Sequence, residues 1–325
     1  MKLGDRLAFM LYPVTLLVLG ARPGLAQDYP VKPVRFIVPF AVGGGADATS
    51  RLVAPRVGER LGQQLVIENR GGAGGTIGAS LGARAAPDGY TIVLATANLS
   101  ASVSLFEKLP FNPLKDFSAV TLLAQTPSVI AVHPSLPARS VRQLIALARA
   151  NPGKINYAGG TVGSLLHLDA EYFKALAKVD IMRVPYNSSG PSMIGIVTGE
   201  ASVVVAPALL VLPHARSGRL SALAIAMRAR APTLPDLPTV IESGLPEYEA
   251  AQWYGILVPA GTPDAIVTRL NREFVHSVQA PELAARLHNE ASFPIGNTPG
   301  EFASFFKADI VKWARVVKLS GARAE

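Results

Sequence analysis

Short apolar runs alternate with helical patterns along most of the chain. Near its start, apolar runs typical of strands occupy residues 34–38, 65–68 and 91–95. Helical patterns lie between them, over residues 48–61 and then up to about residue 85. Strands that alternate with helices are typical of a parallel sheet covered by helices. The pattern therefore predicts an α/β fold that opens with a β-α-β-α-β unit.

The same alternation returns in the middle of the chain. Ser140 and Gln143 have the spacing of a capping box, which predicts a helix that runs through Ala150. Residues 232–246 are rich in proline and predict a long surface loop. Four more strands are expected at residues 155–158, 181–185, 201–205 and 220–226, with helices between them. The middle of the chain therefore predicts a second α/β unit.

The C-terminal part predicts one more strand and two helices. An apolar run occupies residues 253–258. Thr262 is placed to cap a helix whose first residue is Pro263. Thr298 and Glu301 repeat the capping-box spacing before the last helix. The apolar positions of that helix that are expected to face the core are Phe302, Phe305, Ile310 and Trp313.

The N-terminus has the pattern of a secretory signal peptide. Lys2 and Arg6 precede an apolar stretch at residues 7–20, and small residues at 24 and 26 suit cleavage after Ala26. The alternative is a membrane anchor, but the stretch is shorter than the roughly 20 residues a span needs, and Pro13 interrupts it. We therefore predict a periplasmic protein whose signal peptide, residues 1–26, is removed.

Composition narrows the possible chemistry. The chain has 325 residues and a formal net charge of +8. It contains no cysteine, so disulfides, thiolate metal sites and cysteine nucleophiles are excluded. The basic residues are scattered without a long run, so we expect no nucleic-acid partner. The five histidines are dispersed and none has the spacing of metal ligands. We therefore predict no metal and no cofactor.

Signatures of catalysis are weak. The chain contains neither a G-x-S-x-G elbow nor an H-E-x-x-H motif. A nucleophile and a base could come only from Thr161, Ser164 and His167, and no acidic partner accompanies them. For His167, a packing or capping role and a ligand contact are both open. We predict no catalytic residue and no enzyme.

Two glycine loops are the strongest candidates for a binding site. Gly43, Gly44 and Gly45 join a strand to a helix, where free N–H groups favour anions, and Asp47 is the expected N-cap. The alternative is a tight structural turn. A matching loop at residues 159–164 (GGTVGS) also joins a strand to a helix. Two such loops on separate α/β units suggest a ligand with two anionic ends held between them.

A third glycine-rich segment, residues 71–78 (GGAGGTIG), does not match a dinucleotide site. Its glycines have the wrong spacing, and it follows the second strand rather than the first. We expect it to supply a helix N-terminus that lines the same cleft.

A set of ordered motifs resembles the Bug family, the substrate-binding components of tripartite tricarboxylate transporters. The resemblance covers essentially the whole chain after residue 26. The motifs are residues 39–47 (PFAVGGGAD), 68–75 (ENRGGAGG), 86–91 (APDGYT), 156–158 (NYA), 184–186 (VPY), 235–239 (PDLPT) and 259–263 (PAGTP).

This resemblance implies a two-lobed periplasmic binding protein, a type II-like fold with a ligand cleft between two α/β domains. It implies a first lobe of residues 27–126 plus 251–325 and a second lobe of residues 127–250. The chain would cross between the lobes near residues 125–127 and 249–253. The implied function is capture of a small organic acid, such as a di- or tricarboxylate, for delivery to the membrane subunits of the transporter.

The resemblance also implies the binding residues. The first loop would hold a carboxylate and the second would close from the opposite lobe. The implied contacts are Phe40, Ala41, Gly43, Gly44, Gly45, Asp47, Thr76, Thr96, Asn98, Gly160, Thr161, Ser164, His167, Tyr186 and Ala206. Position 206 often carries Asp in similar proteins, and Ala206 followed by Pro207 departs from that pattern. An acidic group there would suit a ligand amine, so its absence disfavours an amino-acid ligand.

Three functions remain to be compared. The leading hypothesis is a monomeric, non-catalytic binder that serves a transporter. The second is a sensor that presents its bound form to a signalling receptor, which neighbouring genes for membrane subunits would distinguish. The third, an enzyme on the same scaffold, would require a nucleophile and a base in the cleft. The sequence does not identify the ligand.

Overall fold

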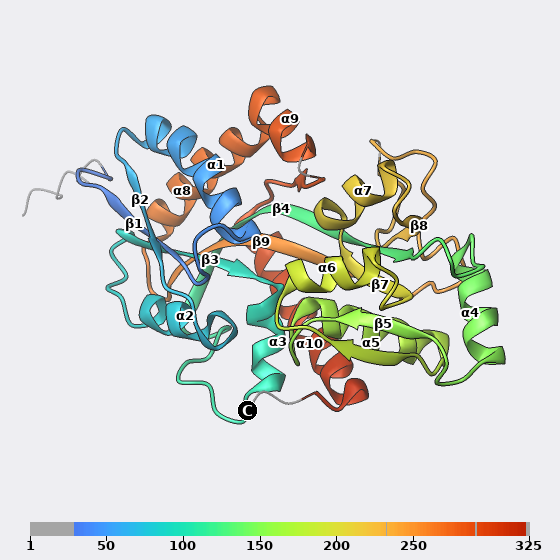
Figure 1. Ribbon diagram of the computed structural model, residues 1–325. Helices are drawn as coiled ribbons and strands as arrows, with labels where there is room; N and C mark the ends of the chain where they lie inside the picture. The colour runs from blue at the N-terminus through green and yellow to red at the C-terminus, as the bar shows by residue number, and fades with distance from the viewer. Residues whose placement is uncertain (1–28, 232, 290, 323–325) are drawn as a thin grey trace, which may run out of the picture.

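The computed structural model describes residues 29–231, 233–289 and 291–322. The signal peptide predicted at residues 1–26 therefore lies outside the described residues. The described chain forms a ten-stranded sheet with the order β2-β1-β3-β9-β4-β7-β5-β6, and β8 and β10 also pair with β4. Helices cover this sheet on both sides (Figure 1).

The strands agree with most of the predicted apolar runs, within one or two residues. They are β1 (Val34–Val38), β2 (Leu65–Asn69), β3 (Thr91–Thr96), β4 (Phe117–Val132), β5 (Asn156–Gly159), β6 (Met182–Pro185), β7 (Val203–Pro207), β8 (Ser221–Ile225), β9 (Ala251–Pro259) and β10 (Phe293–Pro294). The long strand β4 and the short strand β10 are not predicted by the pattern.

The helices follow the strands in the expected α/β alternation. They are α1 (Gly45–Leu61), the 3-10 turn η1 (Ala73–Gly75), α2 (Thr76–Ala83), α3 (Ala97–Leu105), α4 (Val141–Ala150), α5 (Leu165–Ala177), α6 (Ser189–Val197), α7 (Ala208–Arg216), α8 (Asp264–Gln279), α9 (Pro281–Asn289) and α10 (Pro299–Ser320). Helix α3 is not predicted by the pattern.

Two long antiparallel strands connect two groups of parallel strands. In the first group β1 pairs with β2 and β3, and in the second β5 pairs with β6 and β7. Strand β4 pairs with β9 up to Pro127 and with β7 from Ser128 onward. In Figure 1, β4 and β9 run side by side through the middle of the molecule. Within the sheet of described residues, the two parallel groups are therefore joined through these central strands.

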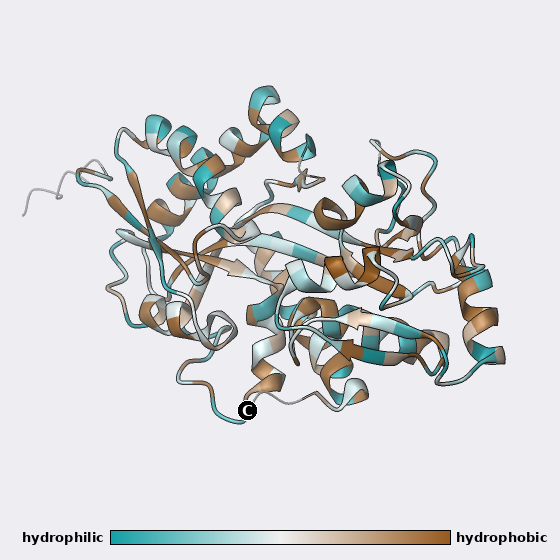
Figure 2. Cartoon of the chain, in the orientation of Figure 1, coloured by the Kyte–Doolittle hydropathy of each residue, from teal (hydrophilic) through white to brown (hydrophobic). Residues whose placement is uncertain are grey.

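The core lies on both faces of the sheet. Apolar side chains of β1 alternate, so Phe36 packs with α1 and α8 while Ile37 packs on the face of α3 and α10. Figure 2 shows hydrophobic residues concentrated on the strands and mixed with hydrophilic ones on the outer helices. Fully buried Trp253 of β9 meets the rings of Phe302, Phe305 and Phe306 on α10. The predicted core face of the last helix is thus confirmed.

Helix starts and loops show where the predictions hold. Ser140 caps α4 and Thr298 forms the predicted capping box with Glu301. Thr262 does not cap α8, because Pro263 takes the N-cap position and the Thr262 hydroxyl donates to the carbonyl of Pro259 at 2.7 Å. The proline-rich loop is not confined to the surface, because Thr239, Val240 and Leu245 are buried.

Candidate functional site

The carboxylate of Asp47 holds the first glycine loop, but it does not have the predicted role of an N-cap. Helix α1 begins at Gly45 with Gly44 as its N-cap, so Asp47 is not the N-cap. The Asp47 carboxylate instead accepts the N–H of Gly43 at 2.9 Å and the side-chain amide of Asn69 at 3.0 Å. Gly43 has a φ of 86°, a conformation that glycine adopts without strain. Gly44 has ordinary extended geometry, and the helix starts three residues earlier than predicted.

Asp47 therefore acts on the loop as a fixed anion. Arg51 donates to it at 3.0 Å, and this bond chiefly holds the pKa of the Asp47 carboxyl below its usual value, against the effect of burial. The N–H of Gly43 is consumed by Asp47 and is not offered to a ligand. The next N–H groups belong to the first turn of α1, where no intrahelical acceptor exists.

The glycines of residues 71–78 serve packing against this loop. A Cβ on Gly78 would lie 2.7 Å from Cβ of Pro39, and one on Gly71 would lie 3.1 Å from the amide nitrogen of Ala41. Tyr254 of β9 also covers the loop, since a Cβ on Gly45 would lie 2.7 Å from its hydroxyl oxygen. Tyr254 could not be predicted as a site residue, because an isolated tyrosine in an apolar strand carries no signal of a site.

A cavity of about 480 Å³ lies where the first half of the chain faces the second glycine loop. Polar lining groups come from Asn98 and Ser102 of α3 and from Thr161 and Ser164 of the second loop. The loop approaches α3 closely, since a Cβ on Gly163 would lie 3.1 Å from a methyl carbon of Leu105. Ala73, Gly74, Leu105, Phe106, Val162 and Gly163 complete the lining. Three of the predicted contacts, Asn98, Thr161 and Ser164, thus meet here.

A small second hollow brings together other predicted residues. Phe40 and Thr96 line it with Gly75, and Gly74 lines both hollows. The hydroxyls of Thr96 and Ser164 are buried and have no hydrogen-bond partner among the described residues. Buried hydroxyls normally find a partner, so these two are free to serve a ligand.

Thr76 is committed elsewhere, because its hydroxyl donates to the carbonyl of Ala73 at 2.9 Å.

His167 holds the second loop. Its Nδ1 accepts the N–H of Gly163 at 3.1 Å, so the proton of the neutral ring resides on Nε2. Burial, assisted by the charge of Arg183, lowers the pKa of His167 to about 4. No bond joins the His167 ring to the Ser164 hydroxyl in the part of the chain that is described. His167 therefore holds the loop through the backbone of Gly163, and its contact with a ligand stays a prediction.

Ten of the fifteen predicted contacts line neither hollow: Ala41, Gly43, Gly44, Gly45, Asp47, Thr76, Gly160, His167, Tyr186 and Ala206. Tyr186 directs its hydroxyl at α6, where a Cβ on Gly195 would lie 1.9 Å from it, and burial raises the Tyr186 pKa to about 12. Ala206 is fully buried within β7 opposite Val129. Ala41 in the first loop is exposed, and Gly160 in the second loop is buried.

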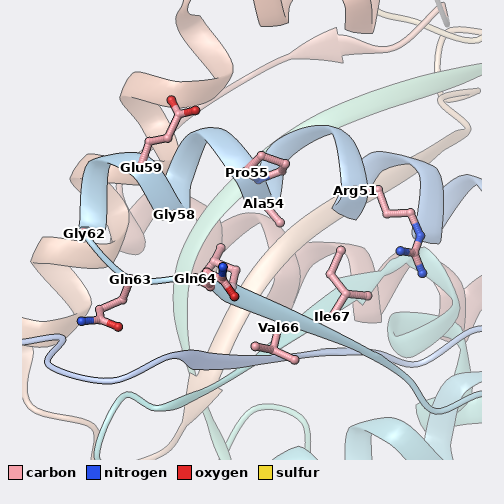
Figure 3. Close-up of a pocket in the computed structure, with 11 residues that line it drawn as sticks. Arg51, Ala54, Pro55, Gly58, Glu59, Gly62, Gln63, Gln64, Val66 and Ile67 are labelled. Atoms are coloured by element: carbon pink, nitrogen blue, oxygen red, sulfur yellow. The ribbon is translucent and has the colours of Figure 1, made fainter.

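A larger groove lies elsewhere. This groove of about 810 Å³ lies between α1 and the end strand β2, and Figure 3 shows Arg51 and Glu59 along α1 with Val66 and Ile67 on β2. It contains none of the predicted contacts and involves only one half of the sheet. We therefore take the 480 Å³ cavity as the candidate site.

No group of three or more His, Cys, Asp or Glu side chains among the described residues is placed to hold a metal ion. None of their helices has the length and apolar character needed to cross a membrane.

Comparison with known proteins places the chain among transport receptors. The model of the tripartite tricarboxylate transporter family receptor matches residues 49–322. Protein BugT of Bordetella pertussis is 35% identical over 305 residues, which cover 93% of this chain and 94% of BugT. Rpa4515 of R. palustris, solved with adipate, is 34% identical with a TM-score of 0.78 over 91% of this chain and 99% of its own. MatC from Rhodopseudomonas palustris, solved with bound malate, is 32% identical with a TM-score of 0.75 over 89% of this chain and 100% of its own.

Proposed function

The chain belongs to the tripartite tricarboxylate transporter receptor family, and from this premise we propose that it binds a small organic acid in the 480 Å³ cavity. The family confirms the predicted two-lobed periplasmic binding fold and the prediction of a receptor rather than an enzyme. The bound acid is then delivered to the membrane subunits of the transporter.

The composition of the cavity is the observation that carries the proposal. Its polar lining consists of one amide and several hydroxyls, and no Asp or Glu lines it within the described chain. Such a lining can donate hydrogen bonds to a carboxylate without repelling it. Adipate and malate, the ligands of two similar proteins, are both dicarboxylates, and a cavity of this volume is of the size that small ligands occupy.

The proposed lobes follow the strand pairing. We place the first lobe at residues 27–126 plus 251–325 and the second at residues 127–250. The change of partner along β4, from β9 at Pro127 to β7 at Ser128, supports a boundary there. The cavity is lined from both proposed lobes, so their closure would enclose the ligand.

Export is proposed to remove residues 1–26. Mass spectrometry of the periplasmic fraction is expected to show a chain that begins at Gln27. Light scattering on that product is expected to give the mass of a monomer. An uncut chain in the membrane fraction would contradict the proposed cleavage.

A calorimetric screen tests the proposed ligand class. We expect dicarboxylates of four to six carbons to bind, and aspartate and glutamate to bind far more weakly. The reason is that burying an ammonium group without a carboxylate partner is costly. Tight binding of aspartate or glutamate, or of no organic acid at all, would overturn the proposal.

A further inference from the structure

A half-buried cation lies behind the second glycine loop and was not among the predicted contacts. Arg183 sits on β6, the end strand of the sheet, directly beside Tyr157 of β5. Neighbouring residues in parallel register share a face. The Tyr157 hydroxyl donates to Glu171 of α5 at 2.7 Å, so Arg183 lies on the face that α5 covers.

The backbone makes room for this side chain and directs it to the loop. A Cβ on Gly159 would lie 2.9 Å from Cγ of Arg183, so the glycine lets the aliphatic stem pass over β5. One terminal nitrogen of the guanidinium then donates to the carbonyl of Gly160 at 2.9 Å. The charge is thereby placed at the end of β5, where the loop that lines the cavity begins.

Arg183 has no counter-ion in the part of the chain that the structure describes. Within the described residues, no carboxylate oxygen lies at ion-pair distance from it, and its buried Nε has no hydrogen-bond partner. The nearby carboxylate of Glu171 is instead paired with Lys174 at 2.8 Å. A buried guanidinium nitrogen without an acceptor is costly, which indicates that an anion completes the site.

The neighbouring groups suit an acidic ligand group. The unpartnered Ser164 hydroxyl lies beside Gly160, since a Cβ on Gly160 would be 2.4 Å from the hydroxyl oxygen. His167 is neutral because Gly163 occupies its Nδ1 and burial disfavours its charged form. The positive charge at this loop therefore comes from Arg183.

We propose that Arg183 pairs with the second acidic group of the ligand, so that the site selects acids with two carboxyl groups over matched acids with one. The inference rests on the proposed function. To the proposed function it adds a residue that sets specificity. It also gives a reason why an acid with one carboxyl group would bind more weakly than an acid with two.

Calorimetry with adipate and hexanoate tests this, because the two acids share a six-carbon chain and differ by one carboxyl group. For the Arg183→Gln variant we expect adipate affinity to fall about 10- to 100-fold, the range for a lost hydrogen bond to a charged group. Hexanoate affinity is expected to stay unchanged, and Arg183→Lys is expected to restore part of the adipate affinity. Arg149→Gln is the matched control, because Arg149 also donates to a carbonyl, that of Ala177 at the C-terminal end of α5.

The outcomes separate the inference from the proposed function. If Arg183→Gln binds adipate as tightly as the wild type, the inference is wrong and the proposed function stands. An equal loss of adipate and hexanoate would make Arg183 a support of the loop and would also overturn the inference. A wild type that binds no organic acid would overturn both.

Discussion

At the scale of single residues, the two glycine loops are fixed by the same device. The N–H of Gly43 is accepted by Asp47, and the N–H of Gly163 is accepted by Nδ1 of His167, each four residues further along. Both glycines have positive φ, at 86° and 79°. The matching loops were predictable from sequence. The side chains that hold the loops were not predictable in this role. Whether such a side chain caps the helix or binds the loop before it depends on where the backbone first becomes helical.

The distinct geometries of Gly43 and Gly44 give a matched pair of variants. Gly43→Ala forces a β-carbon into a left-handed conformation, which costs about 1–2 kcal/mol, and should weaken both folding and ligand binding. Gly44→Ala has an ordinary φ of −82° and a nearest neighbour at 3.8 Å, so it should fold as the wild type does. Thermal melting and adipate calorimetry on both variants measure this. Equal melting temperatures for the two variants would contradict the assigned strain.

Asp169 links stability to pH. It is buried on α5, where Ser128 donates to one oxygen at 2.5 Å and the other has no partner among the described residues. Burial raises the pKa of Asp169 to about 7, and nearby Asp309 adds to the effect while Lys312 opposes it. A raised pKa makes this contribution to stability complete below about pH 4 and lost as pH rises through about 7.

Asp169→Asn should therefore be more stable than the wild type at pH 8, and the difference should shrink towards pH 5. Urea denaturation at the two pH values measures it. A difference that does not vary with pH would contradict the assignment.

At the scale of elements, short apolar runs bounded by turns were predicted well, but β4, α3 and the two-residue strand β10 were not. Strand β4 carries Pro127 at the point where it changes partners, and a proline inside a run argues against a strand. Helix α3 is rich in serine and lacks an amphipathic pattern, since both Ser100 and Ala101 are buried. Tertiary contacts, which are not visible in the local sequence pattern, determine that β4 and α3 form.

Helix α10 is attached to β9 by one buried carboxylate. Asp309 accepts the indole N–H of Trp253 at 2.7 Å and that of Trp313 at 3.1 Å, and Lys312 pairs with it at 2.6 Å. Asp309→Ala leaves these donors without an acceptor and should lower the free energy of unfolding by about 3–5 kcal/mol. Urea denaturation measures it, with Thr298→Ala as a variant on the same helix.

Loss of the Thr298 cap should cost only about 1 kcal/mol. If Asp309→Ala were no more destabilising than Thr298→Ala, the carboxylate would not be what fastens α10 to the sheet.

At the scale of the whole molecule, the family resemblance carried more than the local pattern. Local periodicity predicts two α/β units, but it does not show that β9 returns to lie between β3 and β4. The resemblance implied this return, as a first lobe made from both ends of the chain. Neither the local pattern nor the resemblance predicts Arg183, because its proposed role depends on the space above Gly159.

Ligand binding is expected to make the molecule more compact. If the two proposed lobes close on the acid, the radius of gyration from small-angle scattering should fall when adipate is added. Hexanoate, which lacks the second carboxyl group, should produce less compaction at the same concentration. An unchanged radius at saturating adipate would show that the cavity fills without closure.

The position of β9 has a consequence for how the chain is made. Strand β3 and the first part of β4 both pair with β9, which begins only at Ala251. Until the ribosome has produced that segment, the centre of the sheet has two open edges and cannot form. Pairing between such distant segments makes folding slow, and open edges promote aggregation. Truncated chains that end before Ala251 should therefore depend on chaperones, and folding should be a late event that leaves time for passage across a membrane as an extended chain.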